Sequence, residues 1–126
     1  MSETPFPDIE IYLRDTTTQR VLGWLKQEFP GAEMNTIRHD HKALRLEMDT
    51  DRGTISVTLY FDPLPEYTVV WFDTSATPWN TDLECARVAA LHLGCEVRCS
   101  VGDSDDTDTA QWWRITGDRV EQITWQ

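Results

Sequence analysis

Basic residues are scarce in this sequence, and their scarcity excludes several classes of partner. Eleven Lys and Arg residues stand against 22 Asp and Glu residues, which gives a formal net charge of −11. Direct binding of nucleic acid needs clustered Lys and Arg against the phosphates, so we expect none. The same charge disfavours adsorption to anionic membranes. A basic protein is the partner that this charge would attract.

Long apolar runs and regularly spaced cysteines are also missing. No stretch approaches the ~20 apolar residues that a membrane-spanning helix needs, and residues 1–7 have neither the basic nor the apolar region of a secretion signal. Three cysteines, Cys85, Cys95 and Cys99, do not form a secreted disulfide framework. We therefore expect a cytoplasmic protein with free thiols, built as a single domain over residues 1–126 with a loose lead-in at residues 1–7.

Signatures of catalysis and metal binding are absent as well. The sequence contains no G-x-S-x-G, P-loop or G-x-G-x-x-G motif. Cys85, His92 and Asp73 supply the residue types of a catalytic triad, but no local pattern links them. His39-Asp40-His41 would place two imidazoles on one face of a strand, yet no CxxC or HxxxH pair supports a zinc site. We expect neither enzymatic activity nor a metal or other cofactor.

What the sequence does contain is a short acidic segment near its C-terminus. Four aspartates occur within six residues, at Asp103, Asp105, Asp106 and Asp108. A calcium-binding EF-hand loop would need glycine at its sixth position and glutamate at its twelfth, where this chain has Asp108 and Arg114. The EF-hand interpretation therefore fails. Two alternatives remain, a solvated turn or a patch that meets Lys and Arg of a partner.

Two consecutive tryptophans, Trp112 and Trp113, follow the acidic segment. Neighbouring residues of a strand point to opposite faces of the sheet, so we expect one indole to pack inward and the other outward. The outward tryptophan is either covered by a helix or available as an anchor for a partner, since tryptophan is enriched at interface hot spots.

The hydrophobic pattern predicts an α+β fold, a mostly antiparallel sheet with two helices packed on one face. Period-two alternation predicts strands over 9–13, 44–48, 55–61, 97–101, 112–115 and 120–125, with a shorter strand around 33–38. Residues 67–72 would be apolar on both faces of a strand, which predicts a strand in the middle of the sheet. Without the shorter strand around 33–38, we expect the order β-α-β-β-β-α-β-β-β.

Two helices are predicted, over about 17–29 and about 81–93. Thr16 with Gln19, and Thr81 with Glu84, have the spacing of capping boxes, and Gly94 suits the end of the second helix. The helical residues that we expect to be buried against the sheet are Val21, Leu25, Phe29, Leu83, Ala86 and Ala90.

A short acidic α+β chain with exposed-looking tryptophans and no active-site motif resembles the bacterial immunity proteins that neutralise toxins of contact-dependent and other polymorphic systems. The resemblance is one of kind and extends over the whole chain. It implies a tight complex with a basic toxin domain, often a nuclease, whose contact surface here would be Asp103, Asp105, Asp106 and Asp108 with Trp112 and Trp113. The alternatives are a DNA-mimicking inhibitor of a nucleic-acid-binding protein, or a small ligand-binding or enzymatic α+β domain.

Overall fold

The computed structural model describes residues 8–51, 53–64, 66–73, 77–101 and 111–124. Within these ranges, eight strands form one sheet in the spatial order β2-β3-β4-β5-β1-β6-β7-β8, and all neighbouring strands are antiparallel. The elements are β1 (Ile9–Arg14), α1 (Thr18–Glu28), β2 (Glu33–His39), β3 (Ala43–Thr50), β4 (Gly53–Leu64), β5 (Tyr67–Phe72), α2 (Asp82–Leu93), β6 (Val97–Ser100), β7 (Gln111–Thr116) and β8 (Arg119–Thr124).

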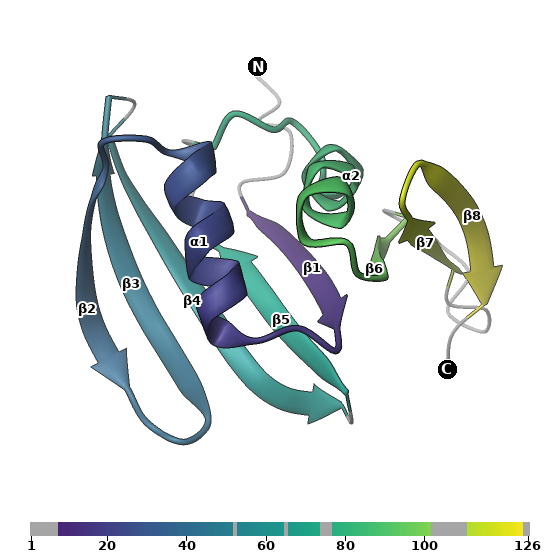
Figure 1. Cartoon of the computed structure of the whole chain (residues 1–126), viewed down its shortest axis with the longest axis horizontal. Coiled ribbons are helices and arrows are strands. Elements are labelled where there is room, and N and C mark those ends of the chain that lie inside the picture. Colours follow the sequence, from purple (N-terminus) through teal and green to yellow (C-terminus); the bar gives the residue numbers. More distant parts are fainter. Residues whose placement is uncertain (1–7, 52, 65, 74–76, 102–110, 125–126) are drawn as a thin grey trace, which may run out of the picture.

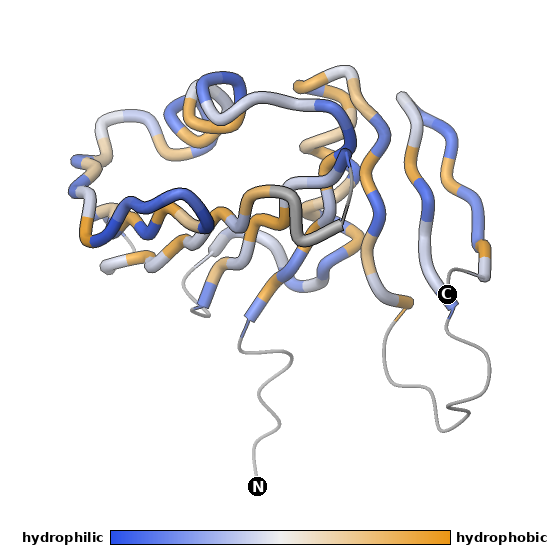
Figure 2. The backbone as a smooth tube through the Cα atoms, turned by 90° about the horizontal axis from the view of Figure 1, so that it is seen from below, coloured by the Kyte–Doolittle hydropathy of each residue, from blue (hydrophilic) through white to orange (hydrophobic). Residues whose placement is uncertain are grey.

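Both helices lie on the same side of the sheet (Figures 1 and 2), which confirms the predicted α+β class. The order along the chain differs from the prediction, because four strands rather than three separate the helices. The strand left out of that order is β2, expected only as a shorter strand around 33–38, and it is a full edge strand of seven residues. Its side chains are mostly exposed, and for this reason its hydrophobic alternation is weak in the sequence.

The middle of the sheet is built from β5 and β1. β5 is apolar on both faces and lies between β4 and β1, as its composition predicts. β1 pairs with β5 along its whole length, from Ile9 opposite Phe72 to Arg14 opposite Tyr67. The first strand of the chain therefore joins the β2–β5 half of the sheet to the β6–β8 half.

Capping residues fix where the helices begin and end. The N-cap of α1 is Thr17, whose hydroxyl accepts from the Arg20 amide, so the predicted cap at Thr16 is wrong by one residue. Thr81 caps α2 as predicted and accepts from the Glu84 amide. Gly94 ends α2 in the left-handed conformation (φ 66°), which glycine adopts without steric cost.

The main core lies between the two helices and the sheet. Trp24 of α1 is fully buried and stacks on Trp79, with ring centroids 5.9 Å apart, and both rings contact Phe72 of β5. Of the six helical residues expected in this core, five are buried and Leu83 is only half-buried. Leu83 lies in the first turn of α2 and packs against the edge of the core. Neither helix in the described part is long and apolar enough to cross a membrane.

Candidate functional site

The candidate site is the face of the sheet that points away from both helices, which we call the open face. Residues opposite each other in register point to the same side of an antiparallel sheet, so the pairing identifies its members. Tyr12 of β1 lies opposite Val69 of β5, and Val69 lies opposite Tyr60 of β4. On its other side, Tyr12 lies opposite Arg98 of β6. This row crosses four strands, and both helices lie on the other side of the sheet (Figure 2).

Five aromatic side chains on the open face form what we call the aromatic cluster: Tyr12, Tyr60, Tyr67, Trp71 and Trp112. Tyr12 and Trp112 meet edge to face, with ring centroids 5.2 Å apart. The indole N–H of Trp71 donates to the Asp8 carboxylate over 3.0 Å. Tyr60 remains 38% exposed. Neighbouring groups thus hold at least three of these rings in place on a face that the helices leave uncovered.

Trp112 and Trp113 lie on opposite faces of β7, as the strand alternation predicts. Trp112 lies opposite Ser100 and faces the open side with Tyr12. Trp113 lies opposite Cys99, which is buried on the helix side, and packs against the main core. Both indoles are half-buried. Trp112 is therefore the tryptophan that a partner approaching the open face would meet.

The predicted acidic contact residues Asp103, Asp105, Asp106 and Asp108 lie outside the described residues. The residues on either side of that segment are described. The Val101 amide donates to the Gln111 carbonyl over 3.2 Å, and Gln111 immediately precedes Trp112. Both attachment points of the acidic segment therefore lie beside Trp112.

A charged network centred on Glu96 lies next to the aromatic cluster. Glu96 accepts hydrogen bonds from Arg98 over 2.7 Å and from the Tyr67 hydroxyl over 3.1 Å, and Arg14 lies 3.5 Å away. Burial by itself would raise the pKa of Glu96, but these hydrogen bonds and the two arginines outweigh it and lower that pKa. Arg14 also pairs with Glu66 at 3.0 Å. The arginines of this part of the open face are therefore oriented by carboxylates on their own chain.

Asp8, Glu10 and Asp82 gather where β1 and α2 begin, and none of the three forms an ion pair among the described residues. Burial, with a smaller contribution from Asp8, raises the pKa of Glu10. Burial also raises the pKa of Asp82 to about 6, and Asp8 and Glu10 add to the shift, although the Glu10 amide donates to Asp82 and opposes it. Raised carboxyl pKa values mark a place where a cation from outside would be electrostatically favoured.

A groove with a volume of about 340 Å³ occupies the other half of the open face, over β2 to β5. We call it the basic groove. Ala43 and Thr58 are its small residues, and the rings of Tyr60 and Trp71 line it. Its charged residues are Arg38, Asp40, Lys42 and Arg45. This local excess of cations is unusual in a chain of charge −11.

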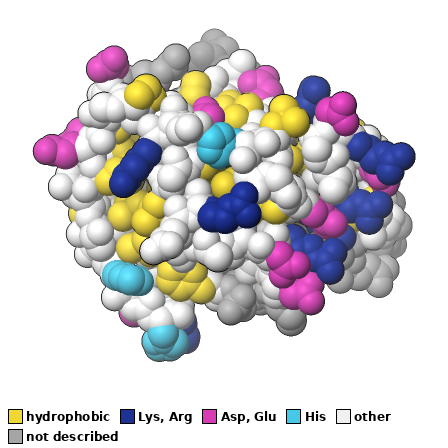
Figure 3. All heavy atoms as spheres, in the orientation of Figure 1, with side chains coloured by type: hydrophobic (Ala, Val, Ile, Leu, Met, Phe, Trp, Pro, Cys, Tyr) yellow, Lys and Arg dark blue, Asp and Glu magenta, His cyan; other side chains and the backbone are white. Residues whose placement is uncertain are grey.

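The cysteines and histidines are dispersed. Cys85 and Cys99 are buried and Cys95 is half-buried, and all three are free thiols. His39 lies against Phe61, with ring centroids 6.3 Å apart. Among the described residues, no group of three or more His, Cys, Asp and Glu side chains is arranged to hold a metal ion. The helix side, seen in Figure 3, carries scattered charges, and apolar side chains show where β2 and β3 extend beyond α1.

Sequence reasoning overlooked most of the aromatic cluster and the basic groove. Tyr12, Tyr60 and Trp71 occupy the outward positions of their strands, and the strand period alone assigns them to that side. Which outward positions become neighbours depends on the strand order, and the sequence does not reveal that order. No protein-family model, curated protein or solved structure matches this chain.

Proposed function

We propose that this chain is a protein-binding inhibitor, of the kind represented by bacterial immunity proteins, and that it binds a basic toxin domain through the open face. The observation that carries the proposal is the aromatic cluster on a sheet face that lies opposite both helices. Large aromatic side chains outside the main core are typical of interface anchors.

The way the rings are held favours binding. Tyr12 and Trp112 support each other, and Trp71 is fixed by Asp8. An aromatic side chain that is already ordered loses little conformational entropy when a partner covers it. Trp112 is the natural anchor, because it lies on the open face directly after the acidic segment.

Charge supports a basic partner. Among the described residues, Asp8 and Glu10 form no ion pair, and they lie on the open face at the start of β1, while the four aspartates of residues 103–108 precede Trp112 in the sequence. Lys and Arg side chains of a toxin domain would be attracted to these carboxylates. The net charge of −11 would in addition speed the encounter with a cationic partner.

The DNA-mimic alternative is less well supported. A protein that imitates DNA needs rows of carboxylates at phosphate-like spacing, whereas the described open face alternates carboxylates with arginines. Arg114 pairs with Glu121 at 2.8 Å, and Arg98 pairs with Glu96 at 2.7 Å. A surface that carries both signs of charge is a poor imitation of DNA, whose phosphates are all negative. It therefore fits the phosphate-binding site of a DNA-binding protein less well than the surface of another protein.

The test begins with the gene beside the gene for this chain, where the proposal expects a toxin to be encoded. Co-expression should protect cells from the toxin, and the purified proteins should form a complex whose affinity can be measured by calorimetry. Trp112→Ala should weaken the complex at least tenfold, because truncating an aromatic anchor costs about 2 kcal/mol. Replacing Asp103, Asp105, Asp106 and Asp108 by Asn should lower the association rate and flatten its dependence on salt.

The matched control is Leu91→Ala. Leu91 is an exposed hydrophobic residue (66% exposed) on α2, on the side opposite the open face. This variant should bind the toxin with unchanged affinity. An equal effect of the Trp112 and Leu91 variants, or no effect of either, would contradict binding through the open face.

A further inference from the structure

We propose that the basic groove binds a small anion that carries a flat ring, such as a nucleoside monophosphate or an aromatic carboxylate. The groove lies over β2 to β5 and does not include Trp112 of β7, the proposed toxin anchor, although it shares Tyr60 and Trp71 with the aromatic cluster.

Lys42 is the cation of the groove most available to an anion, because Arg38 pairs with Asp40 at 3.0 Å. Within the described part of the chain, Lys42 has no ion-pair partner, and the carboxylate nearest Arg45 is that of Asp73, at 4.0 Å. Asp40, the acid of the groove, already accepts hydrogen bonds from the amides of Lys42 and Ala43 and from Arg38. These bonds, with the two amides contributing most, lower the pKa of Asp40. Among the residues that line the groove, one engaged carboxylate thus stands against three cations, with Asp73 beside Arg45 and Asp8 beside Trp71 at its border.

The rings of the groove supply the complementary apolar contact. Tyr60 is more than one-third exposed, and the N–H of Trp71 is already donated to Asp8. What Trp71 offers a ligand is therefore its apolar ring surface rather than its hydrogen-bonding edge. Aromatic and guanidinium planes next to each other are a combination that stacks on flat rings and binds their charged groups.

Small residues give the groove its depth. Thr58, which is buried, lies between Arg45 and Trp71 in register across β3, β4 and β5. Ala43 lies opposite Tyr60 in the next row. Larger side chains at these two positions would fill the space. The resulting volume, about 340 Å³, is at the lower end of the range for small-molecule sites.

The charge of the whole molecule decides between a small anion and a polyanion. At physiological ionic strength, charges more than ~8 Å away are largely screened, so the local cations dominate for a ligand that stays inside the groove. A polynucleotide would extend beyond it over the carboxylates of a chain with charge −11 and be repelled.

The experiment is an NMR titration of the full chain, observing the backbone amides of Ala43 and Thr58. Adenosine monophosphate and, separately, benzoate are added to about 10 mM, well above the Kd of about 1 mM or lower that we expect for a site of this kind. Saturable shifts confined to the groove are the expected result, and the tighter of the two ligands identifies phosphate or carboxylate as the preferred group. Adenosine and inorganic phosphate, which each lack one of the two features, should bind at least tenfold more weakly.

Two variants connect the shifts to the cations. Arg45→Gln and Lys42→Gln should each weaken binding about tenfold, since each removes a charge-assisted contact. Arg45→Gln could weaken binding by disturbing the fold, since Arg45 pairs with Asp73. Lys42→Gln tests the charge without this complication, because Lys42 makes no ion pair in the described part. Arg87→Gln, an exposed cation on α2, is the matched control and should leave the affinity unchanged.

Several outcomes would overturn the proposal. It fails if neither adenosine monophosphate nor benzoate produces saturable shifts at the groove, or if Arg87→Gln weakens binding as much as Arg45→Gln. If neutral adenosine bound as tightly as adenosine monophosphate, the cations of the groove would not contribute to binding. Tighter binding of an oligothymidylate than of adenosine monophosphate would replace the small anion by single-stranded nucleic acid.

Discussion

Asp82 is a residue on which two opposing influences act. It occupies the first turn of α2, where the helix dipole favours a negative charge. It is also largely removed from water and lies near Asp8 and Glu10, and these effects prevail, so its pKa rises to about 6. The carboxylate form of Asp82 is therefore a net cost to the folded protein at neutral pH, although its position in the helix would suggest the opposite.

The first prediction concerns the pH dependence of stability at this residue. Below about pH 4, Asp82 is protonated in both the folded and the unfolded state; as the pH rises to about 6 the unfolded state releases its proton first, and the free energy of unfolding falls. Asp82→Asn keeps an acceptor for the Glu10 amide and removes this loss. The variant should be more stable than the wild type by about 1 kcal/mol at pH 7.5, after allowing for solvent screening of a half-buried group, and by little at pH 4.

Urea denaturation at the two pH values measures this difference. Asp118→Asn, at an exposed position in the turn between β7 and β8, is the control and should change stability little at either pH. A stability gain for Asp82→Asn that is the same at pH 4 and pH 7.5 would mean that the effect is not due to the charge.

At the scale of elements, two glycines have distinct conformational roles, one inside α1 and one at the C-cap of α2. Gly23 lies in the middle of α1 on its exposed side, with helical backbone and no atom within 4 Å of an added Cβ. Gly94 also has free space around it, but its φ of +66° is unfavourable for any residue with a side chain. Because neither substitution creates a clash, their effects on stability isolate the backbone contribution.

The second prediction is that alanine at these two positions changes stability in opposite directions. Gly23→Ala should raise the free energy of unfolding by about 0.5–1 kcal/mol, since alanine loses less backbone entropy in a helix. Gly94→Ala should lower it by about 1 kcal/mol, because it forces a left-handed residue to carry a Cβ. Chemical denaturation of both variants under identical conditions measures the two shifts. Stabilisation by Gly94→Ala would show that α2 ends differently from the structure described here.

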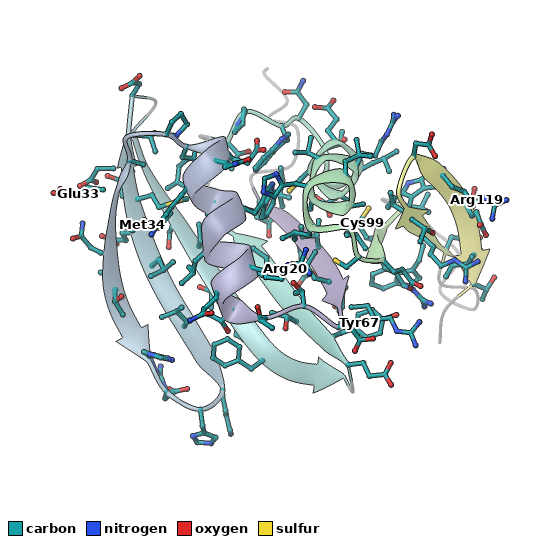
Figure 4. All side chains as sticks on the ribbon, in the orientation of Figure 1. Arg20, Glu33, Met34, Tyr67, Cys99 and Arg119 are labelled. Atoms are coloured by element: carbon teal, nitrogen blue, oxygen red, sulfur yellow. The ribbon has the colours of Figure 1, made fainter. Side chains whose placement is uncertain are left out.

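The two helices also contact each other through a polar link. Arg20 of α1 donates to the carbonyl of Leu93 in the last turn of α2, and Figure 4 shows its side chain lying between the helices. A cation near the C-terminus of a helix satisfies an otherwise unpaired carbonyl and complements the helix dipole. This bond ties the end of α2 to α1, so that both helices cover the sheet as one layer.

At the scale of the whole molecule, the cysteines distinguish the interior from the surface. Cys85 of α2 and Cys99 of β6 are fully buried between helix and sheet, whereas Cys95, in the connection between these two elements, is half-buried. Burial raises the pKa of Cys85 and raises the pKa of Cys99 to about 12, with Asp82 contributing in both cases. A raised pKa lowers the fraction of the reactive thiolate form, and burial keeps alkylating reagents away from the sulfur atoms of Cys85 and Cys99.

The third prediction follows from this arrangement. A thiol reagent applied to the folded protein should modify Cys95 first, and Cys85 and Cys99 should react only when the whole domain unfolds. Their labelling rates, followed by mass spectrometry, should therefore rise together as urea is added. In a Cys95→Ser variant, the labelling rates of Cys85 and Cys99 can be measured without the signal of Cys95. Rapid labelling of Cys85 or Cys99 in the absence of denaturant would indicate that α2 separates locally from β6.

The sequence by itself determined the elements and their inward faces. Alternation over 9–13, 44–48 and 55–61 predicted strands, and helical spacing predicted the two helices to within one or two residues. The opposite orientation of Trp112 and Trp113 followed from the strand period as well. These features are local, because the spacing of apolar residues along a strand or helix depends on the geometry of that element and not on which elements lie next to it.

The tertiary structure alone decided which outward residues meet. The insertion of β1 between β5 and β6 places Tyr12 beside Trp112, one hundred residues later in the chain, and puts Glu96 within reach of Arg14 and Tyr67. The basic groove likewise depends on the register of β2 to β5. Strand order and register are set by the burial of all the inward-facing residues together. Which outward-facing residues become neighbours follows from that order, and the local sequence around those outward residues does not predict it.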